Sequence, residues 1–109
     1  MTEKALVVQE FKLQDVRVLQ AIRRPHPAGI GGEQIVVRFH NEYGASVIQS
    51  PFSYGGERGL WELGIIKFHG PNIDDYKLTH DTHITDDVIG DMSVEDLREV
   101  LLQIAALPA

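Results

Sequence analysis

The run LWELGIIKF, residues 60–68, most constrains this chain because it is apolar on both faces of an extended strand. Side chains alternate between the two faces of a strand. The apolar side chains on one face are Trp61, Leu63 and Ile65, and those on the other face are Leu60, Ile66 and Phe68. A strand with two apolar faces must be covered on both sides. We therefore expect residues 60–68 near the centre of a sheet, with one covering layer on each face.

One covering layer is predicted at the C-terminus, where the sequence has the strongest helix signals. Ser93 can accept a hydrogen bond from the backbone amide of Asp96, whose carboxylate can in turn accept one from the amide of Ser93 in a capping box. The apolar residues that follow recur at helical spacing: Leu97, Val100, Leu101, Ile104 and Leu107. This amphipathic helix would cover one face of the sheet. The other face would be covered by the N-terminal segment or by a second copy of the chain.

Frequent glycines and prolines divide the rest of the chain into short pieces, which favours strands. Three of these pieces are residues 33–40, residues 45–50 after the turn NEYG, and residues 15–24. In the last of them, Val16, Val18 and Ile22 would share one face. Residues 76–84 have the pattern of a half-exposed edge strand, and residues 4–13 suit either a strand or a helix. The fold class predicted is α+β: an antiparallel sheet of four to five strands with one C-terminal amphipathic helix packed on it.

The length of 109 residues is that of a single domain, residues 1–109, in which residues 1–13 could be a loosely attached segment. The chain has no cysteine, which excludes disulfides, thiolate metal ligands and thiol nucleophiles. No apolar run approaches the roughly 18 residues that a membrane-spanning helix needs. The N-terminus also lacks a basic region ahead of its short apolar stretch. We expect a cytoplasmic protein with no membrane partner.

The charge is uneven along the chain. The net charge is −6; residues 1–58 carry a balance of +1 and residues 59–109 a balance of −7. Binding to nucleic acid depends largely on neutralising phosphates, so this composition argues against it. The acidic half is either a solvated surface or a face that meets a basic partner or mimics nucleic acid.

The glycine-rich stretch SYGGERG raises the question of a phosphate-binding loop. Such a loop places the phosphate at the N-terminus of a helix. Gly55, Gly56 and Gly59 instead precede the strand-like run, and a helix there would carry Gly64 in its interior. No Lys-Ser or Lys-Thr pair follows the glycines. The sequence therefore predicts a hairpin bend.

The histidines and acids of THDTHITDD offer one weak candidate for a metal site. Asp81 and His83 would share a face of an extended segment, and Asp86 or Asp87 could join them. His80 would face the other way, and the spacing matches no zinc signature. Solvated side chains explain these residues better, and we expect no cofactor. A site formed by His80, Asp81 and His83 remains the alternative.

The loop PFSYGG is unusual because it places two aromatic residues among glycines and serines. Phe52 and Tyr54 could pack back over the sheet edge or anchor a protein partner. The candidate partner-binding residues are Phe52, Tyr54, Arg58, Trp61, Arg23 and Arg24. Trp61 is either a core residue or part of an interface.

With these residues in view, NEYGASVIQSPFSYGGERGLWEL, residues 41–63, and ITDDVIG, residues 84–90, resemble small uncharacterised accessory proteins of tailed bacteriophages that infect actinobacteria. The resemblance implies a protein made in a bacterial cytoplasm and carries no activity or site residue with it. Short phage proteins of this kind often bind and redirect a host protein.

The functional expectation is a small non-enzymatic protein that binds a host or phage macromolecule. No catalytic motif is present: the chain lacks a Gly-x-Ser-x-Gly elbow and a dinucleotide-binding fingerprint. One alternative is a virion component or another self-assembling structural protein, which would form a homo-oligomer. A further alternative is a divalent-metal-dependent enzyme.

Overall fold

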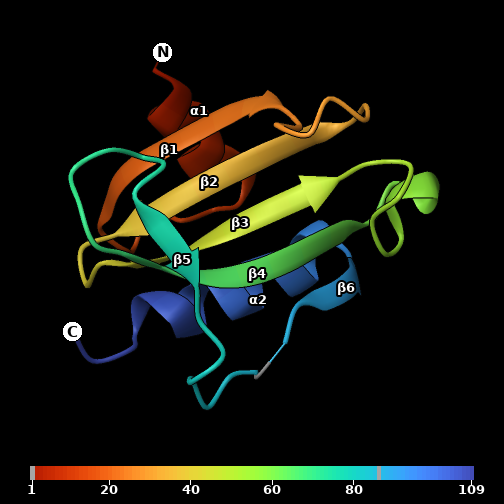
Figure 1. Ribbon diagram of the computed structural model, residues 1–109. Helices are drawn as coiled ribbons and strands as arrows, with labels where there is room; N and C mark the ends of the chain where they lie inside the picture. Colours follow the sequence, from red (N-terminus) through yellow and green to blue (C-terminus); the bar gives the residue numbers. More distant parts are fainter. Residues whose placement is uncertain (1, 86) are drawn as a thin grey trace.

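The computed structural model describes residues 2–85 and 87–109, and Figure 1 shows their arrangement. Within these residues the elements are α1 (Glu3–Glu10), β1 (Val18–Pro25), β2 (Glu33–Phe39), β3 (Tyr43–Gln49), the 3-10 turn η1 (Gly56–Arg58), β4 (Trp61–Phe68), β5 (Tyr76–Leu78), β6 (Ile89–Met92) and α2 (Val94–Ala105). The fold is α+β, as predicted, with a second helix at the N-terminus.

The strands form one antiparallel sheet in the order β1-β2-β3-β4-β5. The edge of β4 that faces away from β3 is shared, because β5 pairs with the second half of β4 and β6 pairs with its first half. The expectation for residues 60–68 is confirmed: β4 lies inside the sheet and has buried apolar side chains on both faces.

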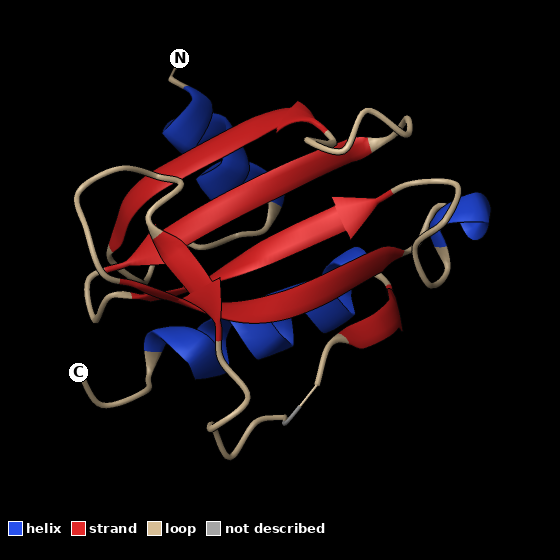
Figure 2. Cartoon of the chain, viewed as in Figure 1, coloured by secondary structure: helices blue, strands red, loops and turns tan. Residues whose placement is uncertain are grey.

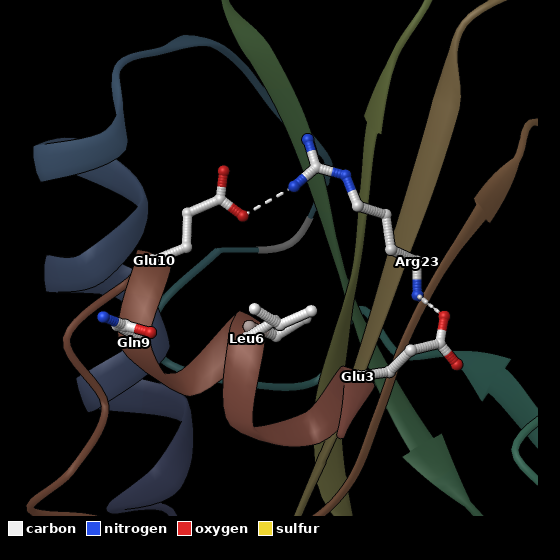
Figure 3. Close-up of a pocket in the computed structure, with 6 residues that line it drawn as sticks. Glu3, Leu6, Gln9, Glu10 and Arg23 are labelled. Carbon is white, nitrogen blue, oxygen red and sulfur yellow. Dashed lines mark hydrogen bonds and ion pairs between the residues drawn. The ribbon is translucent and has the colours of Figure 1, made fainter. Parts of the chain in front are cut away.

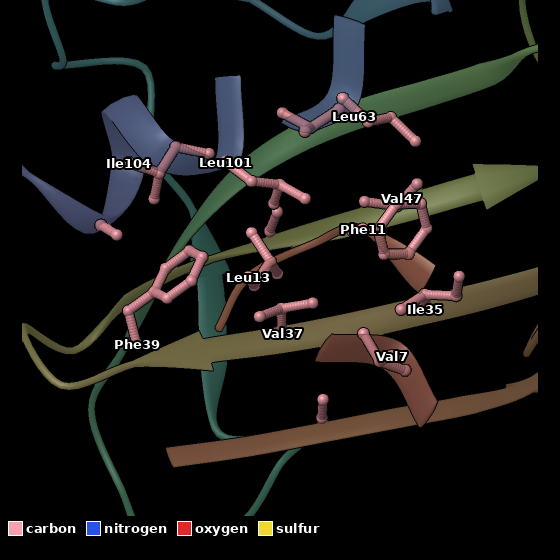
Figure 4. Packing of buried hydrophobic residues seen from close by; sticks show 14 of the residues in the cluster. Val7, Phe11, Leu13, Ile35, Val37, Phe39, Val47, Leu63, Leu101 and Ile104 are labelled. Carbon is pink, nitrogen blue, oxygen red and sulfur yellow. The ribbon is translucent and has the colours of Figure 1, made fainter. Parts of the chain in front are cut away.

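Both helices lie on one face of the sheet, which we call the helical face (Figure 2). Most of residues 4–13 belong to the helix α1 rather than to a strand, and α1 begins after Thr2, whose hydroxyl accepts a hydrogen bond from Ala5 N. Val7, Phe11 and Leu13 are buried in the core on the helical face (Figure 4). The N-terminal segment is therefore part of the core and is not loosely attached.

The opposite face of the sheet is covered by the chain that follows β4. Its core consists of Val36, Ile66 and Phe68, against which Ile22, Ile73 and Tyr76 pack. Arg38 also covers this face, since its guanidinium lies 4.6 Å from the ring centroid of Phe68 and pairs with Glu42. The N-terminal segment, one of the two covering layers considered for this face, lies on the helical face instead.

Three local expectations differ from the structure. A bulge between Val18 and Gln20 shifts the alternation of β1, so that Val18 and Ala21 face the helices while Ile22 packs on the opposite face. The strand expected over residues 76–84 ends at Leu78. Beyond it, β6 forms an additional strand immediately before α2.

The C-terminal helix has the predicted start. Ser93 Oγ accepts from Asp96 N at 3.1 Å, and Ser93 N donates to Asp96 Oδ2 at 3.1 Å, which completes the capping box. Leu97, Leu101 and Ile104 are fully buried against the sheet. This helix therefore covers β3 and β4, while α1 packs on β1.

Candidate functional site

Residues 50–60 connect β3 to β4, and we call this segment the aromatic loop. Two serines brace its first turn. Ser50 N donates to Ser53 Oγ at 2.9 Å, while Ser50 Oγ accepts from the amides of Phe52 and Ser53 at 3.2 and 3.1 Å. A side chain at Gly56 would place Cβ only 1.8 Å from the carbonyl oxygen of Ser50. Glycine is therefore required for the loop to fold back on its own start.

The aromatic loop is also attached to β6. Asp91 N donates to the carbonyl oxygen of Tyr54 at 3.3 Å, and the side chain of Asp91 pairs with Arg58. A Cβ atom at Gly90 would lie 2.4 Å from Tyr54 Cβ, so the strand and the loop are in close contact there. Contacts within the loop and with β6 together fix the backbone that carries the aromatic residues.

The two aromatic side chains are largely exposed, although part of the Tyr54 side chain lies against Gly90 of β6. Phe52 is 78% exposed and Tyr54 is 67% exposed, the highest values among the large apolar side chains described. Phe52 is open to solvent, while Tyr54 rests on β6 with part of its ring and exposes the rest. Since large apolar side chains are usually at least partly covered, this exposure marks a candidate contact surface.

The other residues predicted for this site lie elsewhere. Trp61 is only 5% exposed and packs edge-on against Phe11, with ring centroids 6.5 Å apart, so it is a core residue. Arg23 and Arg24 lie on β1 and point to opposite faces of the sheet. Of the three arginines expected to surround the aromatic pair, only Arg58 belongs to the loop.

Both arginines of β1 are engaged in ion pairs. Arg23 donates from Nε and Nη2 to the two carboxylate oxygens of Glu33 at 2.8 and 2.6 Å, and from Nη1 to Glu10 at 2.7 Å. The bidentate hydrogen bonds raise the pKa of Arg23 and lower that of Glu33. Arg24 pairs with Asp74 at 2.7 Å, which lowers the pKa of that carboxyl group.

The glycines of the loop have the role predicted for them. Gly55 and Gly59 adopt positive φ angles of 81° and 74°, and they flank the single turn η1. Strand β4 follows directly. The segment is a hairpin connection, and the helix that a phosphate-binding loop needs does not follow it.

His80, Asp81 and His83 are exposed and lie between β5 and β6. In the part of the chain that the structure describes, no three histidine or acidic side chains come together as metal ligands. Asp86, which we considered as a further ligand, lies outside the described residues. Shortly after Asp87 the chain enters β6.

Sequence reasoning missed a second surface feature, a groove between α1 and the C-terminal end of β1. It was missed because residues 4–13 suited both a strand and a helix. The signals that would have resolved the choice are Thr2 as an N-cap and Glu3 in the first turn. Once α1 is a helix, its side chains face Arg23 across the groove.

The comparisons with known proteins add no relative: no family model, curated protein or solved structure matches the chain. Within the described residues, none of the helices has the length and apolar character required to cross a membrane. The features of the chain that bear on function are therefore the geometry of the aromatic loop and the distribution of charge.

Proposed function

We propose that this protein is a small, non-enzymatic binding protein that docks on a partner protein through Phe52 and Tyr54. The observation that supports the proposal is the contrast between a braced backbone and two outward aromatic rings. The serine hydrogen bonds and the contact with Gly90 hold the loop, and neither ring is needed to fill the core.

The energetics favour this use of the loop. An aromatic side chain buries roughly 150–250 Å² when it is covered, and aromatic residues are enriched among those that dominate binding free energy. A loop that already has its bound conformation loses little conformational entropy on association. Two aromatic anchors on a rigid loop can therefore supply useful affinity from a small surface.

The partner we propose is a host or phage protein, following the resemblance of residues 41–63 and 84–90 to phage accessory proteins. The surroundings of the aromatic pair are acidic, because Glu57 and Asp91 lie beside the single cation Arg58. A complementary surface would have an apolar pocket with a basic rim. The net charge of −6 disfavours nucleic acid as the partner.

A quantitative pull-down from an actinobacterial lysate tests the proposal. The baits are the wild-type protein, the Phe52→Ala/Tyr54→Ala variant, and Leu19→Ala as a control that removes an exposed apolar side chain on β1. We expect the wild type and the control to enrich the same protein, and the double variant to lose it. Equal enrichment by all three baits would contradict the proposal.

Sedimentation velocity on the purified proteins separates this function from self-assembly. A wild-type dimer that becomes a monomer in the Phe52→Ala/Tyr54→Ala variant would show that the aromatic pair joins two copies of the chain. That result would replace the proposal with the structural, self-assembling alternative. We expect both proteins to sediment as the same species.

A further inference from the structure

A groove of about 490 Å³ lies between α1 and the C-terminal end of β1 (Figure 3). Its size is within the range of ligand-binding clefts. It is lined by two aliphatic residues and four polar or charged ones: Leu6, Val7, Glu3, Gln9, Glu10 and Arg23. The groove shares no residue with the aromatic loop, so it is a separate surface.

The floor of the groove is aliphatic. Leu6 is 53% exposed and lies at the centre of the view in Figure 3, while the neighbouring Val7 is buried in the core. Leu6 therefore presents apolar surface to solvent on a helix whose next residue is fixed by packing. Covering that surface with a second aliphatic side chain would be favourable.

The rim of the groove is acidic. Glu3 and Glu10 border it, and Arg23 is the one cation among the lining residues. The guanidinium of Arg23 is already bonded to Glu10 and to both oxygens of Glu33, so two carboxylates share one cation, and Glu3 adds a third carboxylate nearby. Lys4 of α1 lines a different hollow near the start of β1. The groove thus has an excess of negative charge around an apolar floor.

Two contacts position Arg23, which forms the β1 side of the groove. The guanidinium of Arg23 lies 5.8 Å from the ring centroid of Trp61, which is itself in the core. The backbone amide of Arg23, on the edge strand β1, donates to Glu3 Oε1 over 3.4 Å. That long bond uses little of the acceptor capacity of the Glu3 carboxylate, which can still accept from an incoming cation.

We propose that the α1–β1 groove binds a basic segment of a partner protein. An aliphatic side chain of the segment packs on Leu6, and lysine or arginine residues beside it pair with Glu3 and Glu10. Charge complementarity selects this occupant, since an acidic segment would be repelled by the rim and a neutral one would supply no cation to the Glu3 carboxylate.

The test is a titration of the full-length, ¹⁵N-labelled protein with two capped peptides, Gly-Lys-Leu-Lys-Gly and Gly-Glu-Leu-Glu-Gly, followed by amide chemical shifts. We expect saturable shifts at the amides of Leu6, Glu10 and Arg23 with the lysine peptide only. The shifts should weaken as salt is added, because exposed ion pairs are screened. Trp61 is the sole tryptophan, and its fluorescence gives an independent readout through Arg23.

Two variants sharpen the test. Leu6→Ala and Glu3→Gln should each weaken the lysine peptide roughly three- to tenfold, while Leu19→Ala on β1 should leave binding unchanged. Both variants leave the Arg23–Glu10–Glu33 contacts in place, and thermal unfolding checks that each is folded. Equal binding of the two peptides, shifts confined to the aromatic loop, or no saturable shift at millimolar peptide would each overturn the proposal.

Discussion

Asn41 connects the turn between β2 and β3 to the end of α2. It is 3% exposed, and its amide nitrogen donates to the carbonyl oxygens of Ile104 and Leu107, both at 2.9 Å. Its side-chain oxygen accepts from Tyr43 N at 3.0 Å. One side chain from a distant turn therefore caps the helix. It supplies the hydrogen-bond donor that the last carbonyl groups of a helix lack within the helix itself.

Replacing Asn41 with alanine should lower the free energy of unfolding by about 1–3 kcal/mol, because buried carbonyl groups lose their donor. Urea unfolding followed by the fluorescence of Trp61 measures the change. The matched control is Asn72→Ala in the exposed loop after β4, which we expect to change stability by less than about 0.5 kcal/mol. Equal stabilities of the two variants would show that Asn41 does not hold the end of α2.

The ion pairs make stability depend on pH at the acid end. Arginine hydrogen bonds lower the pKa of Glu33 and Glu42 below 4.5 and that of Asp74 below 3.8. As pH falls, these carboxylates are protonated in the unfolded chain before they are protonated in the folded one. The stabilisation is therefore complete above pH 4.5 and is lost as pH falls through the lowered pKa values of the folded state. Each exposed pair contributes less than about 1 kcal/mol.

We therefore expect the free energy of unfolding to decrease as pH falls below 4.5, and the Glu33→Gln variant to show a shallower decrease. Urea unfolding at a series of pH values from neutral to below 3.8 measures both slopes. A wild-type stability that stays constant over this interval would contradict the account of these pairs, as would identical slopes for the two proteins.

At the scale of elements, the segments whose apolar residues recur at strand or helix spacing were predicted from sequence. The segments that depend on tertiary contacts were not. β2, β4 and α2 carry apolar residues at strand or helix spacing along their whole length. α1 is short, and most of its stabilisation comes from packing of Val7 rather than from its own propensity. β6 has only four residues and exists because it pairs with β4.

The contact between β6 and the aromatic loop gives a test at this scale. In Gly90→Ala, the new methyl group would lie 2.4 Å from Tyr54 Cβ, so the loop must move away from the strand. Hydrogen exchange at the Asp91 amide, which donates to Tyr54 O, should accelerate roughly tenfold. Binding to the partner should weaken as well, although Phe52 and Tyr54 are unchanged.

The matched control is Gly64→Ala on the neighbouring β4. Its methyl group meets the end of the Leu78 side chain, which can move aside, so the Asp91 amide should keep its protection. If both glycine variants leave exchange at Asp91 unchanged, the loop is not held by β6 and its rigidity has another origin.

For the whole molecule, the sequence predicted the layers that cover the sheet better than it predicted the partner-binding residues. Two apolar faces on residues 60–68 required cover on both sides, which the structure supplies with helices on one face and the chain after β4 on the other. Of the six candidate partner-binding residues, Phe52, Tyr54 and Arg58 lie together. Trp61 is a core residue, the first of the two roles considered for it. Arg23 and Arg24 lie away from the loop, because the position of a side chain depends on strand register and, in β1, on the bulge.

The central claim is that the aromatic loop holds Phe52 and Tyr54 for a partner, with no share in the stability of the fold. The free energy of unfolding of the Phe52→Ala/Tyr54→Ala variant, measured in urea through Trp61 fluorescence, tests it most directly. We predict a value within about 0.5 kcal/mol of the wild type, as for other exposed positions. A loss of about 3 kcal/mol, the size expected for truncating a buried aromatic residue, would contradict the claim.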